Sequence, residues 1–240
     1  LIRLQSIDLL KLALARHDID INEEDHVGQT ALWYLLSNSY HDQASAFQES
    51  ALKLIAEDAR CNINAVAIGG RNYIMRVLRS RISSLELLDV LLDRGADLNH
   101  KDEHGESAIF YAITLRYDMK VAAKLIKEGA DLTVRNYRGQ GLLHRLVSDL
   151  GDSQGHPYLD LLIDSMPALV NFQDERGRTP LHVALFLGKT HLAKVLLARD
   201  SDVSILDNYG RSAFDVACQY GRLSLLERLM PPLAARHHRV

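Results

Sequence analysis

The sequence has few of the residues that build disulfide-rich or all-β proteins. Its 240 residues include two cysteines and five prolines, and only 6% are aromatic. Cys61 and Cys218 are too few for the disulfide framework of a small secreted domain and too far apart for a metal-ligand motif. The low aromatic content disfavours a β-sandwich or barrel. We therefore expect an intracellular protein with reduced thiols and with no cofactor or metal.

Long apolar runs and a large excess of one charge are also absent. The apolar run Leu181–Leu187 is interrupted by His182, and a membrane span needs 18 or more apolar residues. Lys and Arg total 28 against 31 Asp and Glu, so the formal net charge is −3. This balance provides no general attraction to nucleic acid or to an anionic membrane. Because the sequence starts at Leu1 within a helix-like pattern, we expect it to be part of a longer polypeptide.

A short motif recurs along the whole chain: a glycine, then a polar residue, then Thr or Ser and two apolar residues. Clear copies start at Gly28, Gly105, Gly177 and Gly210, and weaker copies start at Gly70 and Gly139. The spacings between successive glycines are 42, 35, 34, 38 and 33 residues. Self-similarity with a period in this range is the signature of a repeat protein.

One copy identifies the kind of repeat. Thr179-Pro180-Leu181-His182-Val183-Ala184 matches at every position the T-P-L-H-x-A helix start of the ankyrin repeat, whose period is 33. The chain thus resembles an ankyrin-repeat protein over essentially its whole length. The resemblance implies an all-α fold, an ankyrin-repeat solenoid of stacked helix-turn-helix units with short hairpin-like loops. We expect a single domain, 1–240, with a partial unit at 1–24, repeats at about 25–66, 67–101, 102–135, 136–173, 174–206 and 207–232, and a tail at 233–240.

Local signals at the expected helix ends support this division. Thr179 is a good N-cap, and Pro180 suits the first helical position because its missing N–H would have no partner there. Gly95 and Gly129 are placed to end helices in the left-handed conformation. Gly141 stands where other copies have a capping Thr or Ser, and we expect this to weaken the helix start by roughly 1 kcal/mol.

Candidate catalytic residues are better explained by structure. The resemblance implies that His144 and His182, at the signature His position, bond the backbone of the neighbouring loop rather than act as general bases. Ser212, Asp215 and His182 do not indicate a triad, since helix capping accounts for the first two residue types. We therefore predict no catalytic residue and no enzyme activity in these 240 residues.

Trp33 and Tyr34 suggest an alternative function. Some ankyrin arrays resemble methyl-lysine readers, in which aromatic rings enclose a cation, so a methyl-lysine or histone-tail reader is one possibility. Trp33 stands at the signature His position, which normally points between helices, and core packing explains it better. A second alternative is a scaffold domain of a larger enzyme or signalling protein.

The resemblance also implies a binding surface, formed by the turns and the exposed side of each first helix. Carried onto this sequence, it places arginines and aromatic residues together on the last three repeats. Such residues dominate interface energetics, and Arg can bind carboxylates in a bidentate way. The predicted partner-binding residues are Tyr137, Arg138, Arg176, Arg178, Phe186, Tyr209, Arg211 and Tyr220.

We predict a non-catalytic module that is monomeric, binds an acidic or aromatic-bearing protein segment at these residues, and binds neither nucleic acid nor membrane. Two other interpretations of the arginines remain open. They can serve solubility alone, or they can contact nucleic-acid phosphates. Phosphate binding would fall steeply with salt.

Overall fold

In a computed structural model the chain is all-helical over the residues that it describes, which are 6–37, 46–80, 85–116, 119–149, 151 and 157–225. No β-strand occurs in these ranges. The predicted tail at 233–240, and the last repeat beyond residue 225, lie outside them. Contacts divide the chain into two compact units, Leu1–Val121 with Lys127–Ala130, and Ala122–Ile126 with Asp131–Val240. We call these unit 1 and unit 2.

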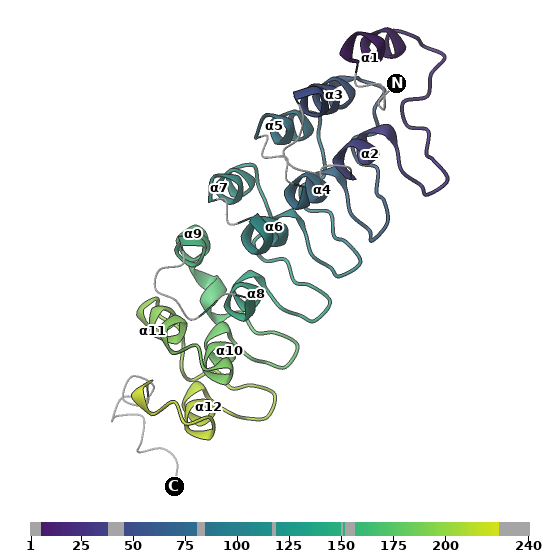
Figure 1. Ribbon diagram of the computed structural model, residues 1–240. Helices are drawn as coiled ribbons and strands as arrows, with labels where there is room; N and C mark the ends of the chain where they lie inside the picture. The colour runs from purple at the N-terminus through teal and green to yellow at the C-terminus, as the bar shows by residue number, and fades with distance from the viewer. Residues whose placement is uncertain are drawn as a thin grey trace. The chain divides into compact units, whose positions relative to one another are not determined.

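In unit 1 the helices form two rows (Figure 1). One row, which we call the inner row, lies nearer the long loops and contains α2, α4 and α6. The other, the outer row, contains α1, α3 and α5. Inner helices contact inner helices, outer contact outer, and α2·α3 and α4·α5 join the rows. The elements are α1 (Ile7–Leu14), α2 (Ala31–Ser37), α3 (Ala46–Glu57), α4 (Tyr73–Arg79), α5 (Leu85–Asp93), α6 (Ala108–Tyr111) and the π-helical η2 (Ala112–Arg116).

Unit 2 repeats this arrangement. Its inner row contains α8, α10 and α12, and its outer row contains α9 and α11, with α8·α9 and α10·α11 joining the rows (Figure 1). Helix α7 (Met119–Lys127) has residues in both units. The remaining elements are α8 (Leu142–Asp149), α9 (Pro157–Ser165), η3 (Pro167–Asn171), α10 (Pro180–Leu187), α11 (Thr190–Ala198), α12 (Ala213–Gln219) and η4 (Leu223–Leu225).

The helices begin and end where local chemistry directs them. The Asn72 side chain accepts the N–H of Met75 at 3.1 Å and caps α4. Gly95 and Gly129 follow their helices with φ of +76° and +93°, as predicted for left-handed helix ends. Each end therefore satisfies backbone groups that the helix itself leaves unpaired.

Apolar side chains between the rows form the core of each unit. In unit 1 Trp33 is 6% exposed, and its ring centroid lies 5.9 Å from that of Tyr73. The Arg76 guanidinium lies 5.6 Å from the centroid of Trp33, so this aromatic face is already covered. Trp33 is a core residue, as the packing interpretation predicts.

Candidate protein-binding surface

The turns of unit 2 are built around buried carboxylates. In the turn before α10, Asp174 Oδ1 accepts the backbone N–H groups of Arg176 and Arg178, each at 2.9 Å. Its Oδ2 accepts Nε and Nη2 of Arg178 at 2.9 and 2.7 Å. One carboxylate thus closes the turn through Oδ1 and also holds the Arg178 guanidinium through two charge-assisted hydrogen bonds to Oδ2.

The turn before α12 has the same construction. Asp207 Oδ1 accepts the N–H groups of Tyr209 and Arg211 at 2.9 and 3.0 Å, and Oδ2 accepts Arg211 Nε and Nη2 at 2.9 and 2.7 Å. Arg211 Nη1 also donates to Gln219 Oε1 at 3.0 Å. The guanidinium is therefore held from two sides. Its Cζ atom lies 4.9 Å from the centroid of the Tyr209 ring.

These carboxylates are ionised in the folded protein. Burial raises the pKa of Asp174, but hydrogen bonds from the Arg178 side chain and backbone lower the pKa by more, so it lies below its usual value. The pKa of Asp207 is lowered overall in the same way, with burial opposed by hydrogen bonds from Arg211. Each turn therefore contains an internally neutralised Asp–Arg pair.

The two turns are also bonded to each other. The Asn208 backbone N–H donates to the Arg176 oxygen at 2.9 Å, and Asn208 Nδ2 donates to the Glu175 oxygen at 2.9 Å. The contact needs glycine at position 177, where φ is +70° and an added Cβ would lie 2.4 Å from Asn208 Oδ1. Adjacent turns thus form a continuous hydrogen-bonded edge.

The two signature histidines connect α8 and α10 to the turn of the following repeat, as predicted. His144 Nε2 lies 2.7 Å from the Arg178 oxygen, and His182 Nε2 lies 3.2 Å from the Arg211 oxygen. A carbonyl only accepts, so Nε2 carries the proton in both rings. Burial lowers the pKa of both imidazoles, which are 1% exposed. Their surroundings favour a neutral structural ring.

Five of the eight predicted binding residues meet around one hollow of about 220 Å³. They come from the two turns and from α10. The hollow is lined by Arg176, Arg178, Phe186, Tyr209 and Arg211, together with His182, Asp207 and Val216.

The other three predicted residues lie outside this lining. Tyr220 follows α12 and packs edge-on against Phe186, with ring centroids 5.1 Å apart. Tyr137 and Arg138 are exposed in the turn before α8, Tyr137 by 68%. The geometry thus brings six of the eight predicted residues together around the last two described turns and leaves Tyr137 and Arg138 on the turn before them.

The sequence analysis missed the roles of Asp174 and Asp207. Both stand four residues before an arginine, and this spacing across a tight turn is the signal that could have paired them. Arg178 and Arg211 therefore serve as frame residues, by which we mean residues whose side chains hold the shape of their own turn. Arg176 differs, because no carboxylate of the described residues forms an ion pair with it, and its side chain is exposed.

Two other classes of site find no support in the described part of the chain. No group of three or more His, Cys, Asp or Glu side chains there is placed to bind a metal ion. Within the same ranges, no helix combines the length and apolar character that crossing a bilayer requires.

Comparison with known proteins agrees with this construction. The family model "Ankyrin repeats (3 copies)" matches residues 143–238. The target of rapamycin complex 2 subunit AVO2 of Saccharomyces cerevisiae is 29% identical over 64% of this chain and 36% of its own length.

Two further relatives are the probable 26S proteasome regulatory subunit p28 of Saccharomyces cerevisiae and the human transient receptor potential cation channel subfamily A member 1. The first is 31% identical over 57% of this chain and 59% of its own length. The second is 27% identical over 62% of this chain and 13% of its own length. The chain thus spans about a third of AVO2, three fifths of p28 and an eighth of the channel. The capped helix pairs and Asp-closed turns are those of an all-α ankyrin-repeat solenoid, and residues 143–238 match ankyrin repeats, which are protein-interaction modules.

Proposed function

We propose that the hollow of unit 2 binds an acidic, aromatic-bearing segment of a partner protein, and that this is the module's function. The observation that carries the proposal is the hollow itself. Its rim holds the guanidinium of Arg176, which forms no ion pair with any carboxylate of the described residues, beside the rings of Phe186 and Tyr209, which are 44% and 74% exposed. A carboxylate of the ligand can bind Arg176 there, and an aromatic ring of the ligand can pack on Phe186 or Tyr209.

Charge favours an acidic ligand. Arg178 and Arg211 are neutralised by Asp174 and Asp207, so Arg176 leaves the lining with a net positive charge. A guanidinium at the edge of an apolar surface binds a carboxylate in a bidentate way with geometric specificity. The aromatic residues supply rigid contact area at low entropic cost.

The cysteines agree with the predicted intracellular setting, since Cys61 and Cys218 are both free thiols. The relatives and the family point to a non-catalytic role. We further propose that the module acts as a monomer and binds neither nucleic acid nor membrane.

The test is a selection of short random peptides displayed against the full chain. Peptides enriched on the wild type should combine Asp or Glu with Tyr, Phe or Trp. Arg176→Glu and Tyr209→Ala should each weaken binding of an enriched peptide about tenfold, which corresponds to ~1.4 kcal/mol. Lys194→Glu is the matched control, because Lys194 is an exposed cation on the outer helix α11.

Basic enriched peptides, or equal affinity for wild type, Arg176→Glu and Tyr209→Ala, would overturn the proposal. The phosphate interpretation is examined with a single-stranded DNA oligonucleotide. Binding of this probe that weakens steeply with salt and is lost in Arg176→Glu would assign the hollow to nucleic acid instead. Charge reversal at Arg178 or Arg211 is unsuitable as a test, since it would disrupt the turn.

A further inference from the structure

We propose that the partner segment binds unit 2 in the polyproline II conformation, with two carboxylate side chains three residues apart and an aromatic side chain three residues beyond the second carboxylate. This proposal rests on the function proposed above and deepens it, because it gives the ligand a conformation and a spacing. The spacing can be satisfied in either chain direction.

Three turns of unit 2 have the same hydrogen-bonded geometry. Asn136 Oδ1 accepts the N–H groups of Arg138 and Gln140, each at 3.0 Å. Asp174 and Asp207 accept the corresponding N–H groups in the two later turns. In addition, the N–H of each first turn residue donates to the backbone oxygen four residues later, at 3.1, 2.9 and 2.9 Å along the chain. Equivalent positions of the three turns are therefore structurally comparable.

One of these equivalent positions is filled by two cations and a ring. The residue two places after the first turn residue is Arg138, then Arg176, then Tyr209. We call these three the turn-tip residues. All three are exposed, and no carboxylate of the described residues forms an ion pair with either arginine. The turn-tip residues thus present two available guanidinium groups followed by an aromatic ring.

Contacts between the turns set the distance from one turn-tip residue to the next. A Cβ added at Gly139 would lie 2.6 Å from the backbone nitrogen of Glu175, and the Asn208 N–H donates to the Arg176 oxygen at 2.9 Å. The helices behind these turns, α8, α10 and α12, contact one another in order (Figure 1). Packed helices lie about 8–10 Å apart, so each turn advances by about this distance.

This spacing selects the conformation of the ligand. A polyproline II segment has three residues per turn and a rise of ~3.1 Å, so every third side chain lies on one face, ~9 Å apart. In a β-strand the side chains of one face are spaced by about 6.6 or about 13 Å, and neither spacing matches. The polyproline II segment therefore brings one side chain to each turn.

An α-helical ligand also has a suitable spacing, since side chains seven residues apart lie about 10.5 Å apart on one face. A helix docks through a continuous apolar stripe. The surface around the turn-tip residues has one hollow, lined by Phe186 and Tyr209, with Arg138 and Arg176 on the turns before it. One ring and two cations suit a segment that places a single side chain at each turn.

Charge assigns the ligand side chains to the turns. Asn136 and Gln140 stand where the later turns have a paired Asp and Arg, and Asn136 Nδ2 donates to Gln140 Oε1 at 3.2 Å. The charge of Arg138 is thus added to a neutral frame, as the charge of Arg176 is added to a neutralised one. One carboxylate of the ligand lies at each of these arginines, and its ring lies in the hollow beside Tyr209.

A carboxylate of the protein opposes this binding. Glu175 is exposed and precedes Arg176, and its Cβ would lie 3.1 Å from a Cβ added at Gly139. Its side chain therefore starts against the turn that carries Arg138. Because like charges near the ligand weaken its binding, removal of this charge should strengthen the complex.

The probes are fluorescent synthetic peptides titrated into the full chain. Two peptides carry the proposed spacing, Asp-Pro-Pro-Asp-Pro-Pro-Phe and its reverse, and their prolines fix the polyproline II conformation. The matched ligand control, Asp-Asp-Pro-Pro-Pro-Pro-Phe, has the same composition with the acids side by side. We expect the tighter of the two spaced peptides to bind about tenfold more tightly than this control, which is the gain from a second charge-assisted contact.

Variants test the position of the first carboxylate. Arg138→Gln should weaken the spaced peptide about fivefold and should not affect a peptide in which the Asp farthest from Phe is Asn, as a double-mutant cycle requires. Arg135→Gln removes the same charge from the same loop, but this guanidinium lies 5.1 Å from the Phe172 ring centroid, and the affinity should be unchanged. Glu175→Gln should strengthen binding about twofold.

The outcomes separate this proposal from the function on which it rests. Equal affinities for the spaced and control peptides, or an equal effect of Arg138→Gln on both peptides of the cycle, would overturn the spacing and leave an acidic, aromatic ligand in place. A helical peptide with acids seven residues apart that binds more tightly than the spaced peptides would overturn the conformation. If no acidic peptide binds at all, both the proposed function and its extension are wrong.

Discussion

The imidazole of His144 reaches from α8 to the turn of the next repeat, where its Nε2 atom lies 2.7 Å from the backbone oxygen of Arg178. In α10 the matching ring of His182 is satisfied at both nitrogens, because Nδ1 accepts the Thr179 N–H at 3.2 Å and lies 2.8 Å from Thr179 Oγ1. His144 Nδ1 is buried and has no hydrogen-bond partner among the described residues. The difference arises from Gly141, which replaces the threonine.

We therefore expect Gly141→Thr to stabilise the protein by about 1 kcal/mol, since it restores both the helix cap and a partner for His144. The site has room, because an added Cβ would lie 3.7 Å from His144 Nδ1 and 3.9 Å from Phe172. Urea unfolding measures the change. Gly141→Val is the control, with the same shape and no hydroxyl, and a valine variant as stable as the threonine one would contradict this explanation.

The free energy of unfolding should fall as the pH drops through about 6.5. Burial lowers the folded-state pKa of His144 and His182, so the unfolded chain binds more protons than the folded chain just below that pH. Well above that pH the imidazoles are neutral in both states, so this loss of stability is absent. The pKa values of Asp174 and Asp207 are also lowered, from 3.8, and their contribution is lost only in stronger acid.

Urea midpoints at about pH 7.5 and about pH 5 separate these windows. A double variant with His144→Gln and His182→Gln retains an amide donor toward each carbonyl but does not titrate. Its midpoint should change less between the two pH values. An unchanged pH slope would mean that other groups cause it.

The glycine turns offer a matched pair for the contact between repeats. Gly177 and Gly210 have φ of +70° and +72°, yet an added Cβ meets Asn208 only at Gly177. Gly210→Ala should cost about 1 kcal/mol from backbone strain alone. Gly177→Ala should cost at least 1 kcal/mol more, because it also separates the bonded turns. Equal losses in thermal or urea unfolding would show that the turns do not depend on this approach.

Arginines in the same turn should behave differently on charge reversal. Arg178→Glu leaves the buried carboxylate of Asp174 opposite a like charge and should destabilise the fold by about 3 kcal/mol. Arg176→Glu, on an exposed side chain, should change the free energy of unfolding by less than ~0.5 kcal/mol. Differential scanning calorimetry on both variants provides the comparison, and similar losses would remove the distinction between frame and binding arginine.

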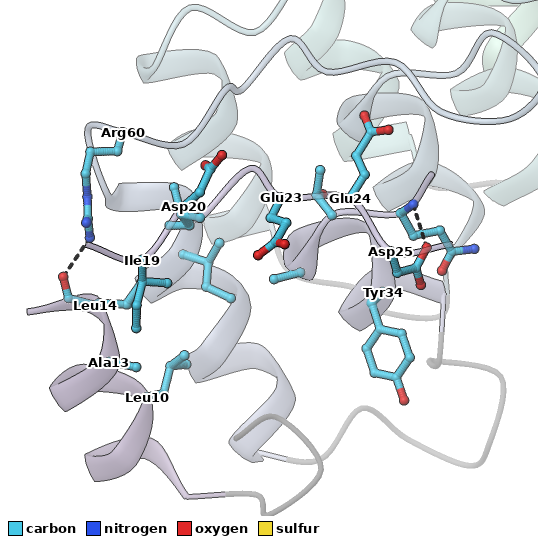
Figure 2. Close-up of a pocket in the computed structure, with 15 residues that line it drawn as sticks. Leu10, Ala13, Leu14, Ile19, Asp20, Glu23, Glu24, Asp25, Tyr34 and Arg60 are labelled. Atoms are coloured by element: carbon cyan, nitrogen blue, oxygen red, sulfur yellow. Dashed lines mark hydrogen bonds between the residues drawn. The ribbon is translucent and has the colours of Figure 1, made fainter. Parts of the chain in front are cut away.

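Features encoded by neighbouring residues could be predicted from the sequence. Thr179 and Pro180 predict the start of α10, and Gly95 and Gly129 predict helix ends. The signature position predicts that His182 bonds a neighbouring turn. Arg178 was predicted as a binding residue. Its pairing with Asp174 was missed, because the two side chains meet only when the turn has formed. The cavity lined by Leu10, Tyr34 and Ile55 (Figure 2) could not be predicted, because these residues come together only through packing of α1, α2 and α3.

The carboxylate at position 207 accepts the N–H groups of residues 209 and 211 and the guanidinium of Arg211. Tyr209 contributes only its main chain to these hydrogen bonds, although its ring lies beside the Arg211 guanidinium, and Arg176 contributes only its main chain in the preceding loop. Side chains at these two positions can accordingly be exchanged while the loop keeps its shape. New specificities can be engineered, or can evolve, one residue at a time without a large change in the free energy of unfolding.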